Sequence, residues 1–412
     1  MRASAGGAFY GWRIVSVAFL SLFVSVGFGF YSYGAFFRAL AEEFGGSRLG
    51  VGVGLSLFTI TNGLIAPFLG RAVDRGSMRA IMTLGACLLA AGFFVIARVE
   101  SLPSFYLVLA TLVALGAALL GGLTTSTLVA NWFVRRRGTA LGIATMGISL
   151  SGVVMAPAAT ALIAAVGWRR AFLTYGLLTL VIVLPAVRLF VVDRPEDMDL
   201  LPDGDTRLDA TVDDSGSASG PMWHALAERS FWVIATVIAL NFCANGAILT
   251  HIIPHAVDLG NSPTRAALVL SAIAAFGVLG KVIFGWIADR LEPRVALWLS
   301  SGLQAVATVG LLWAERYAAL LTVAVVFGLG MGGLVPLWGA LVGSVYPRRA
   351  FGRVMGLMSP VMLPLQATGV PLAGWIFDRW GSYLPAFRLF VALYLLSMLV
   401  LVLLPSQQPA RR

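Results

Sequence analysis

The chain has 412 residues, of which 59% are hydrophobic and only 12% are charged, and its mean hydropathy is +0.89. A soluble domain typically carries about 25% charged residues, so a chain this apolar could not cover a water-facing surface with polar groups. The net charge of +10 could suggest nucleic acid as a partner, but the arginines are spaced between apolar runs and do not gather on one soluble face. The composition therefore predicts an integral membrane protein and argues against a nucleic-acid partner.

The first apolar run, residues 14–37, contains 24 uncharged residues. It is too long for the apolar core of a typical signal peptide and predicts a first membrane span. The two cysteines, Cys87 and Cys243, lie in separate apolar segments and do not predict a disulfide. No residues have the spacing of a metal site, and we expect no metal or cofactor.

Further stretches without Asp, Glu, Lys or Arg follow along the chain. A bilayer core of about 30 Å needs about 20 apolar helical residues for each crossing. The eighth stretch continues to about Ala288 if Lys281 is tolerated within it. On this basis the sequence predicts twelve spans, at residues 14–37, 49–70, 80–97, 101–134, 138–168, 171–187, 230–257, 266–280, 295–314, 317–347, 354–377 and 389–410.

The distribution of arginines predicts the orientation of these spans. With the N-terminus placed in the cytoplasm, 19 arginines fall on cytoplasmic segments and 9 on external ones. Short cytoplasmic loops carry the excess of basic residues in membrane proteins, so we expect both termini in the cytoplasm, together with RRRG (135–138) and YPRR (346–349). The single lysine among 28 arginines indicates a bacterium with a GC-rich genome, and we expect the bacterial inner membrane.

One polar segment interrupts the apolar pattern. Residues 193–221 contain Gly, Ser and Pro and hold 9 of the 19 acidic residues of the chain. This composition predicts a soluble, acidic, cytoplasmic linker. It divides the chain into an N-terminal six-helix half, residues 1–192, and a C-terminal six-helix half, residues 222–412.

The two halves repeat one another in sequence. GRAVDR (70–75) recurs as GWIADR (285–290) at an offset of 215, and Gly138 matches Gly352 at an offset of 214. Several matches at nearly one offset indicate an internal duplication. Parallel six-helix repeats joined by a polar linker are the architecture of one large class of secondary transporters, which hold substrate near the membrane midplane between the halves.

The GxxxDR pattern at the ends of spans two and eight resembles the signature of the major facilitator superfamily. The resemblance implies an all-α fold of twelve transmembrane helices in two six-helix pseudo-repeats. Further segments look like the branch of bacterial monocarboxylate transporters and oxalate/formate antiporters: YGWRIV (10–15), YGAFFRALAEEFGGSR (33–48), NWFVRRRGTALGIA (131–144), GWRRAF (167–172) and RPEDMDLLPDG (194–204).

Lys281 is the only lysine and lies inside the apolar run 266–288. A charged side chain within a span costs at least about 2.5–3.5 kcal/mol, so it normally faces a cavity or a partner. The alternative is that Lys281 snorkels to the cytoplasmic surface. In monocarboxylate transporters, the segment resembling GKVIFGWIAD (280–289) has an arginine at the place of Lys281, and this resemblance implies that Lys281 binds the substrate carboxylate. Those relatives also have an aspartate where this chain has Gly277, so proton coupling through that group is absent here.

Three other spans contribute candidate pocket residues. Tyr31 occupies the place of a first-span lysine in the same relatives, and its alternative role is packing or an interfacial hydroxyl. His251 and His255, four residues apart on span seven, are candidate proton carriers, and we also interpret His251 as a substrate ligand. Their alternative is packing near the external end of the span. Gln366 is a further pocket candidate, although interhelical hydrogen bonding explains it as well.

The duplicated pairs Asp74–Arg75 and Asp289–Arg290 lie at predicted cytoplasmic helix ends. There the charges can pair across helices and cap a neighbouring helix, which would stabilise the outward-facing state and break during alternating access. The alternative is that they only set topology. Their duplication favours a gating role.

The motifs GxxxxGK[ST], HExxH and GxSxG are absent, so the sequence predicts neither an ATP-driven pump nor an enzyme. We predict secondary active transport of a small organic monoanion, lactate- or pyruvate-like, by alternating access, with protons as a candidate coupling ion. One intramembrane cation matches one carboxylate, because a dicarboxylate would leave a second charge in a poorly solvated cavity.

Three alternatives remain open at this point. One is carboxylate exchange of the oxalate/formate type, and another is efflux of small lipophilic compounds. A third is a non-transporting membrane sensor that signals through the acidic linker, but the linker lacks the hydrophobic periodicity of a folded output domain. The expected partners are a small organic anion and the lipid bilayer, and we expect a monomer.

Overall fold

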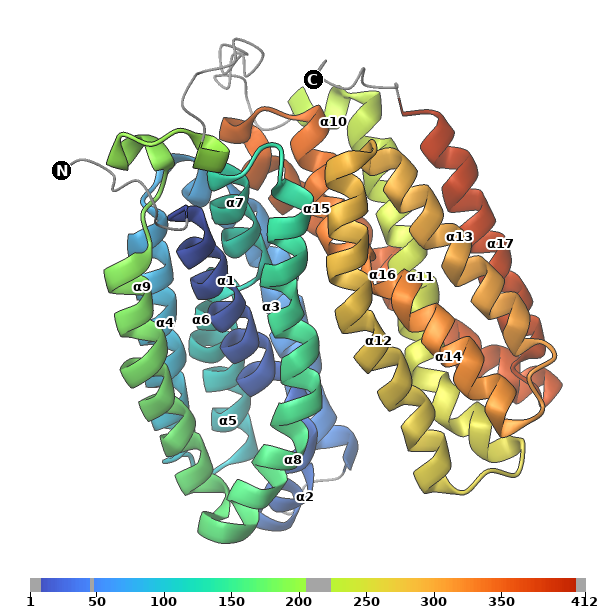
Figure 1. Cartoon of the computed structure of the whole chain (residues 1–412). Coiled ribbons are helices and arrows are strands. Elements are labelled where there is room, and N and C mark those ends of the chain that lie inside the picture. Colours follow the sequence, from blue (N-terminus) through green and yellow to red (C-terminus); the bar gives the residue numbers. More distant parts are fainter. Residues whose placement is uncertain (1–8, 45–47, 205–223, 405–412) are drawn as a thin grey trace. The chain divides into compact units, whose positions relative to one another are not determined.

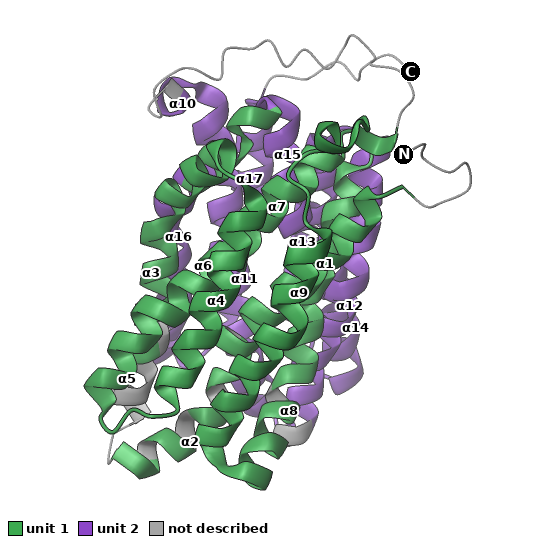
Figure 2. Cartoon of the chain, turned by 90° about the vertical axis from the view of Figure 1, so that its left-hand side faces the viewer, with its two compact units in different colours: residues 1–216, 348–356 green, residues 217–347, 357–412 purple. Residues whose placement is uncertain are grey.

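A computed structural model describes residues 9–44, 48–204 and 224–404 (Figure 1). Regular structure within these ranges is helical throughout. The chain forms two compact units (Figure 2). Unit 1 comprises residues 1–216 and 348–356, and unit 2 comprises residues 217–347 and 357–412. Unit 1 therefore contains a short segment, 348–356, that the sequence assigns to the second half.

The helices of unit 1 cover the first six predicted spans and the start of the linker. Apolar side chains drive their formation, and Ser77 and Ser101 cap the N-termini of two of them by accepting a backbone N–H. The α-helices are α1 (Gly11–Val26), α2 (Tyr33–Phe44), α3 (Arg48–Arg75), α4 (Met78–Ile96), α5 (Leu102–Val108), α6 (Ala114–Leu120), α7 (Gly122–Trp132), α8 (Arg137–Leu178) and α9 (Leu184–Phe190). The π-helical turns are η1 (Gly27–Tyr31), η2 (Leu109–Val113) and η3 (Thr179–Val183), and the 3-10 turns are η4 (Pro195–Met198), η5 (Pro202–Gly204) and η6 (Arg348–Ala350).

The helices of unit 2 cover predicted spans seven to twelve. Proline stands in the first turn of three of them, where its missing N–H costs nothing. They are α10 (His224–Ala227), α11 (Arg229–Asp258), α12 (Pro263–Arg290), α13 (Pro293–Leu311), α14 (Tyr317–Gly332), α15 (Leu334–Val345), α16 (Phe351–Trp380) and α17 (Leu384–Val402). The first six residues of α16 belong to unit 1.

The helices confirm the predicted order of spans. By length and composition, 10 helical segments in the described part of the chain could cross a membrane. The other two predicted spans, 49–70 and 295–314, coincide with α3 and α13. The eighth span runs without a break through Lys281 to Arg290, as predicted. Part of the last predicted span, residues 405–410, lies outside the described residues.

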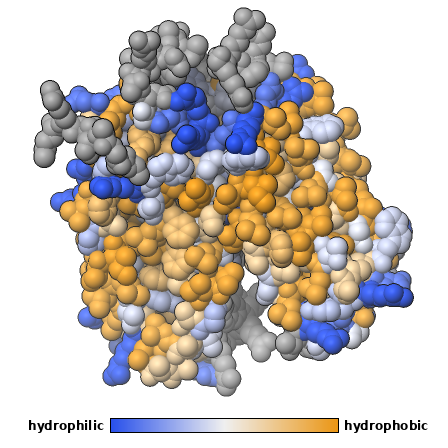
Figure 3. Space-filling model, viewed as in Figure 1, coloured by the Kyte–Doolittle hydropathy of each residue, from blue (hydrophilic) through white to orange (hydrophobic). Residues whose placement is uncertain are grey.

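The outer surfaces of the helices are apolar. Orange side chains dominate the sides of the helices in Figure 3, and hydrophilic ones gather at the helix ends. Leu64, Phe68 and Leu107 in unit 1 and Trp313 and Leu399 in unit 2 each expose more than 60% of their surface. Such side chains are tolerated when the surrounding medium is lipid.

Each unit also has its own buried core. In unit 1 the rings of Phe36 and Phe172 stack with centroids 4.1 Å apart. In unit 2 polar bonds join the helices: Ser301 donates to Asn241 at 3.0 Å, which links α13 to α11. Tyr394 of α17 donates to Asn245 at 2.7 Å. Asn241 and Asn245 thus make the interhelical contacts that stabilise bundles in lipid.

The predicted fifth and sixth spans meet at Gly167, within the helix labelled α8. Gly167 has φ 79° and ψ 162°, a conformation that is essentially restricted to glycine. An added Cβ would contact no atom within 4 Å, so backbone conformation and not lack of space requires glycine here. This single residue reverses the chain between the two spans.

Candidate functional site

Lys281 lies in α12 and exposes only 5% of its surface. Glycines bring α12 and α14 into backbone contact at this level: a Cβ on Gly280 would collide with the Leu329 carbonyl, and one on Gly332 with the Gly277 carbonyl. The same Cβ on Gly332 would lie 2.9 Å from the backbone nitrogen of Lys281. A snorkelling lysine would keep its ammonium in water, and the burial of Lys281 does not match that alternative.

The predicted tenth span has a one-residue irregularity near Lys281. α14 ends at Gly332 and α15 begins at Leu334, but Gly333 between them keeps helical angles, φ −67° and ψ −26°. In unit 1 the fourth span is broken at Gly121, which separates α6 from α7 and is extended, with φ −80° and ψ −163°. Broken helices are typical of substrate sites in transporters, because freed backbone groups can bind the substrate. The letters GGL recur at 121–123 and 332–334, and our sequence reading did not use them.

Tyr31 is the last residue of the π-helical turn η1 in the first span. Its ring packs on α8 at Gly152, where an added Cβ would lie 3.1 Å from the ring carbons. The turn is held by Ser32, whose hydroxyl donates to the Gly27 carbonyl at 2.8 Å, and by Tyr175, which donates to the Ser32 hydroxyl at 3.0 Å. π-helical turns are frequent at functional sites, so the backbone at Tyr31 has a feature that hydropathy does not reveal.

His251 joins three elements of unit 2. Its Nε2 lies 3.1 Å from the Val370 carbonyl of α16, and its Nδ1 lies 3.2 Å from the Tyr383 hydroxyl. Because a carbonyl only accepts, Nε2 carries a proton, and in the neutral ring Nδ1 accepts from Tyr383. Both ring nitrogens are therefore occupied, and this geometry favours the packing alternative for His251.

His255 is packed among aromatic rings and is 6% exposed. Its ring meets Phe387 edge-on at 4.9 Å and Tyr383 at 6.0 Å. Its Nε2 has no hydrogen-bond partner among the described residues. A charged imidazole would be poorly solvated in these surroundings, which makes His255 a less suitable proton carrier than its sequence position indicated.

Gln366 lies half-buried on α16, between Pro364 and Pro371. Proline removes a backbone donor, so Pro371 leaves the carbonyl four residues earlier without its helical hydrogen bond. Gln366 thus lies in a part of α16 where proline removes helical hydrogen bonds, and its role in a pocket stays a prediction.

The carboxylate of Asp74 caps α16 within unit 1. It accepts the backbone N–H of Gly352 at 2.9 Å and that of Arg353 at 2.8 Å, and Arg353 Nε lies 3.7 Å away. The Asp74 side chain is only 1% exposed. An anion at a helix N-terminus satisfies unpaired N–H groups and interacts favourably with the helix dipole.

Gly70 explains the spacing of the GxxxDR pattern. A Cβ on Gly70 would collide with the Gly352 carbonyl, so glycine lets the start of α16 approach α3. Gly70 and Asp74 are four residues apart and face the same side of the helix. Gly70 allows the close approach of α16, and Asp74 caps the N-terminus of α16.

The other charged residues of the two repeated pairs have different surroundings. Arg75 is exposed at the end of α3. In unit 2 Arg290 is also exposed, and its guanidinium lies 3.8 Å from the centre of the Trp286 ring, a cation–π contact. Asp289 is half-buried beside it.

The start of the acidic linker is ordered against unit 1. We call residues 191–204 the strap. Asp203 accepts three backbone N–H groups of the loop just before α8, from Val134 at 2.9 Å, Arg135 at 2.8 Å and Arg136 at 3.1 Å. At the other end of the strap, Trp132 Nε1 donates to the Val192 carbonyl at 2.9 Å. Residues 205–221 of the predicted linker lie outside the described residues.

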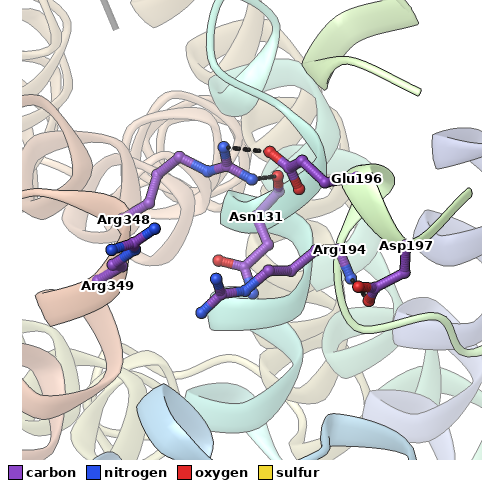
Figure 4. Close-up of a pocket in the computed structure, with 6 residues that line it drawn as sticks. All are labelled: Asn131, Arg194, Glu196, Asp197, Arg348 and Arg349. Atoms are coloured by element: carbon purple, nitrogen blue, oxygen red, sulfur yellow. Dashed lines mark hydrogen bonds and ion pairs between the residues drawn. The ribbon is translucent and has the colours of Figure 1, made fainter. Parts of the chain in front are cut away.

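The strap also carries an ion pair to the segment before α16. Glu196 accepts from Arg348 Nη1 at 3.0 Å, and Arg348 Nη2 donates to the Asn131 carbonyl (Figure 4). The Arg348 side chain is 10% exposed, whereas Glu196 is 46% exposed. We call Asp74, Asn131, Glu196, Arg348 and Arg353 the linker-end cluster. Sequence reasoning found only Asp74 among them, although the quoted segments RPEDMDLLPDG, YPRR and NWFVRRRGTALGIA contain Glu196, Arg348 and Asn131.

The described residues contain ten helical segments that are long and apolar enough to cross a membrane, with a buried lysine inside one of them and a charged cluster at helix ends, and these are the features of a multi-span membrane transporter. Comparison with known proteins identifies the family. The model of the Major Facilitator Superfamily matches residues 18–363 and, in a second match, residues 257–412. The chain belongs to the Major Facilitator Superfamily.

Curated relatives include transporters of the monocarboxylate group. The chain is 30% identical over 415 residues to monocarboxylate transporter 11 of Homo sapiens, covering 97% of this chain and 84% of the relative. It is 25% identical over 366 residues to the uncharacterized MFS-type transporter YcxA of Bacillus subtilis, covering 86% of this chain and 85% of the relative. These relatives agree with the resemblance that the sequence motifs indicated.

Solved structures share the fold at lower identity. The proton:xylose symporter XylE superimposes with a TM-score of 0.80 at 14% identity, covering 96% of each chain. The human organic anion transporter MFSD10 superimposes with a TM-score of 0.71 at 17% identity, covering 95% of this chain and 99% of the other. At these identities the similarity shows the fold alone.

Proposed function

We propose that the protein is a secondary transporter of a small organic monoanion, a lactate- or pyruvate-like monocarboxylate, and that it works by alternating access. The observation that carries the proposal is the burial of Lys281 inside the span formed by α12. A charged side chain buried in a span normally faces a cavity or a partner, and a transported carboxylate suits such a position. The monocarboxylate transporters among the relatives support the same substrate class.

The single lysine favours a substrate with one carboxylate. Predicted span eleven, residues 354–377, contains neither lysine nor arginine, so it offers no second intramembrane cation. A dicarboxylate would bring a second charge into a poorly solvated site without a matching partner. The main alternative to this proposal is carboxylate exchange of the oxalate/formate type.

Proton coupling would need an unusual carrier in this chain. No Asp or Glu lies in the middle of any predicted span, and Gly277 stands where animal relatives have an aspartate. The substrate carboxyl or Lys281 itself would have to carry the proton, while the packed surroundings of His251 and His255 argue against either ring. Transport measurements are therefore needed to distinguish symport, exchange and uniport.

We further propose that the linker-end cluster works as a gate. The segment 348–356 packs in unit 1, while α16 continues into unit 2 at residue 357. Movement of α16 away from α3 would therefore break the Asp74 cap and the Glu196–Arg348 ion pair. The bias of arginines predicts that this end faces the cytoplasm of a bacterial inner membrane, with both termini on the same side. In this proposal the protein acts as a monomer.

The test is uptake of radiolabelled lactate and pyruvate into proteoliposomes, with and without Lys281→Ala. We expect the variant to lose saturable uptake. Its purification yield and its size-exclusion profile should stay the same, which shows that it still folds. Arg265→Ala is the matched control, because it removes an exposed positive charge from the first turn of the same helix. Full uptake by Lys281→Ala would refute the assignment.

Two further measurements separate the modes of transport. Uptake that requires a carboxylate preloaded on the opposite side would identify an exchanger, and uptake driven by an imposed pH gradient would identify a symporter. Binding of lipophilic cations in place of carboxylates, unaffected by Lys281→Ala, would identify the efflux alternative.

A further inference from the structure

Unit 2 contains a layer of buried polar side chains. Its members are Asn241 and Asn245 on α11, Ser301 and Gln304 on α13, and Tyr394 on α17, and each of these five is at most 4% exposed. α17 packs against both α11 and α13 (Figure 1). Bulk water does not reach such groups inside a lipid-embedded unit, so each donor and acceptor needs a partner within the fold.

One pair in this layer is joined directly, and the next pair is not. Ser301 donates to Asn241 Oδ1 at 3.0 Å, and this bond links α13 to α11. Among the described residues, Asn245 Nδ2 and Gln304 Oε1 are both buried and have no hydrogen-bond partner. Asn245 Nδ2 is a donor and Gln304 Oε1 is an acceptor. Because an unsatisfied buried group costs free energy, this pair of atoms points to a bound molecule that can both accept and donate.

The other contacts of the two amides fix which atom of each is left over. Gln304 Nε2 donates to the Ser300 carbonyl at 3.1 Å, and since a carbonyl only accepts, the nitrogen and not the oxygen of this amide faces Ser300. Tyr394 donates to Asn245 Oδ1 at 2.7 Å, which leaves Nδ2 as the remaining donor. The hydroxyl oxygen of Tyr394 keeps a lone pair that can accept a further hydrogen bond.

Asn245 and Gln304 lie at the same level of unit 2. Short turns before and after α12 reverse the chain twice, so α11 and α13 run in the same direction. With a helical rise of about 1.5 Å per residue, Asn245 lies about 6 Å beyond Asn241, and Gln304 lies about 4.5 Å beyond Ser301. Each follows its bonded neighbour by three or four positions and so lies on the same face of its helix. The two faces joined by the Ser301–Asn241 bond therefore also carry the two unsatisfied amides.

We propose that one buried water molecule binds in unit 2 between Asn245 Nδ2 and Gln304 Oε1. The water oxygen accepts the N–H of Asn245, one water hydrogen is donated to Gln304 Oε1, and the other is donated to the Tyr394 hydroxyl oxygen. Three hydrogen bonds are typical of a buried water molecule in a protein. The N–H donor disfavours a metal cation and the carbonyl acceptor disfavours an anion, so the site selects a small neutral molecule.

The water molecule makes α11, α13 and α17 depend on one another. It is held by one side chain from each of these helices and continues the polar contacts begun by the Ser301–Asn241 bond. A ligand that binds only the folded arrangement stabilises that arrangement. The inference goes beyond the proposed transport function, because it requires neither Lys281 nor a particular substrate.

The experiment is X-ray radiolytic labelling of the full-length protein in nanodiscs, in which hydroxyl radicals formed from water oxidise the side chains beside that water. We expect mass spectrometry to find oxidised Tyr394, whereas Phe36, which is equally buried in the apolar core of unit 1, should stay unmodified. Gln304→Leu should abolish the labelling of Tyr394. Ser301→Ala is the matched control, since it removes a neighbouring hydroxyl on the same helix but neither bridging atom, and it should keep the labelling. Lys281→Ala should also keep it, which separates this test from that of the transport proposal.

A thermal double-mutant cycle tests the same bridge without labelling. Asn245→Leu and Gln304→Leu should each lower the Tm, and the double variant should lose less than the sum of the two shifts, because either single substitution already removes the water molecule. Additive shifts would mean that the two amides share no ligand. The proposal is also wrong if Tyr394 is no more oxidised than Phe36 in the unmodified protein, or if its oxidation persists in Gln304→Leu.

Discussion

Asp74 and Gly352 lie 278 positions apart in the sequence, yet the Asp74 carboxylate accepts the Gly352 backbone N–H at 2.9 Å. The contact joins the end of α3 to the first turn of α16 inside one compact unit. It gives the GxxxDR pattern a physical meaning, because an acidic residue is needed to cap a helix that belongs to the other half of the sequence.

We expect Asp74→Asn to weaken this cap by about 0.5–2 kcal/mol, because the amide keeps only one of the two acceptor oxygens and loses the charge that the helix N-terminus favours. The amides of Gly352 and Arg353 should then exchange hydrogen faster, which mass spectrometry of the peptide covering 348–356 measures. Asp289→Asn is the control: it changes the repeated copy of the motif and should leave exchange in this peptide unaltered. Equal protection in Asp74→Asn and the unmodified protein would show that the carboxylate is not needed.

The ion pair between Glu196 and Arg348 should contribute modestly, because Glu196 is 46% exposed and solvent screens the pair. A double-mutant cycle with Glu196→Gln and Arg348→Gln should give a coupling free energy of about 0.2–1 kcal/mol in thermal or chemical unfolding. Raising the salt concentration should reduce it. A coupling of zero at low salt would mean that the strap and η6 are held together by their other contacts alone.

Gly277→Asp tests the meaning of the missing acidic residue. A Cβ at Gly277 would lie 3.3 Å from Met331 Cε and 3.6 Å from the Gly328 carbonyl, so the flexible methionine must move slightly but no backbone collision arises. An aspartate four residues before Lys281 lies on the same helical face and should compete with the substrate carboxylate for the ammonium. We expect lactate uptake at pH 7.5 to fall about tenfold or more, which corresponds to about 1.4 kcal/mol of competition.

Acidification should relieve this competition, because a protonated aspartate no longer pairs with Lys281. Uptake by Gly277→Asp should therefore recover at pH 5, whereas the isosteric control Gly277→Asn should show the pH dependence of the unmodified protein. The same pH profile for both variants would mean that residue 277 does not interact with Lys281.

Gly167→Ala should lower stability by about 1–3 kcal/mol through backbone strain alone. The added methyl group meets open space, so the loss arises from φ 79° and not from a clash. Gly122→Ala provides the matched control: it also adds a methyl group to open space, but within a helix, and should be neutral or slightly stabilising. Thermal unfolding in detergent measures both, and equal Tm values for the two variants would contradict the strain argument.

Much of the fold could be predicted because the relevant signals are local. Hydropathy defined the spans, the offset of GRAVDR to GWIADR showed the duplication, and Lys281 was recognisable by being a lone charge in an apolar run. The prediction that span eight passes through Lys281 is confirmed by the uninterrupted α12. The letters GGL at 121–123 and 332–334 were also visible, but a glycine pair alone does not distinguish close packing from a broken helix.

The sequence by itself determined the medium, the order of the spans, the repeat and the position of an unusual lysine, since each depends only on neighbouring residues or on comparing one half with the other. Tertiary structure alone decided the hydrogen-bond partners. It showed that Asp203 binds the backbone N–H groups of residues 134–136 before α8, that His251 contacts Val370 and Tyr383, and that the strap belongs to unit 1. Such contacts depend on which helix ends lie close together in the folded chain, and composition carries no information about the distances between helix ends.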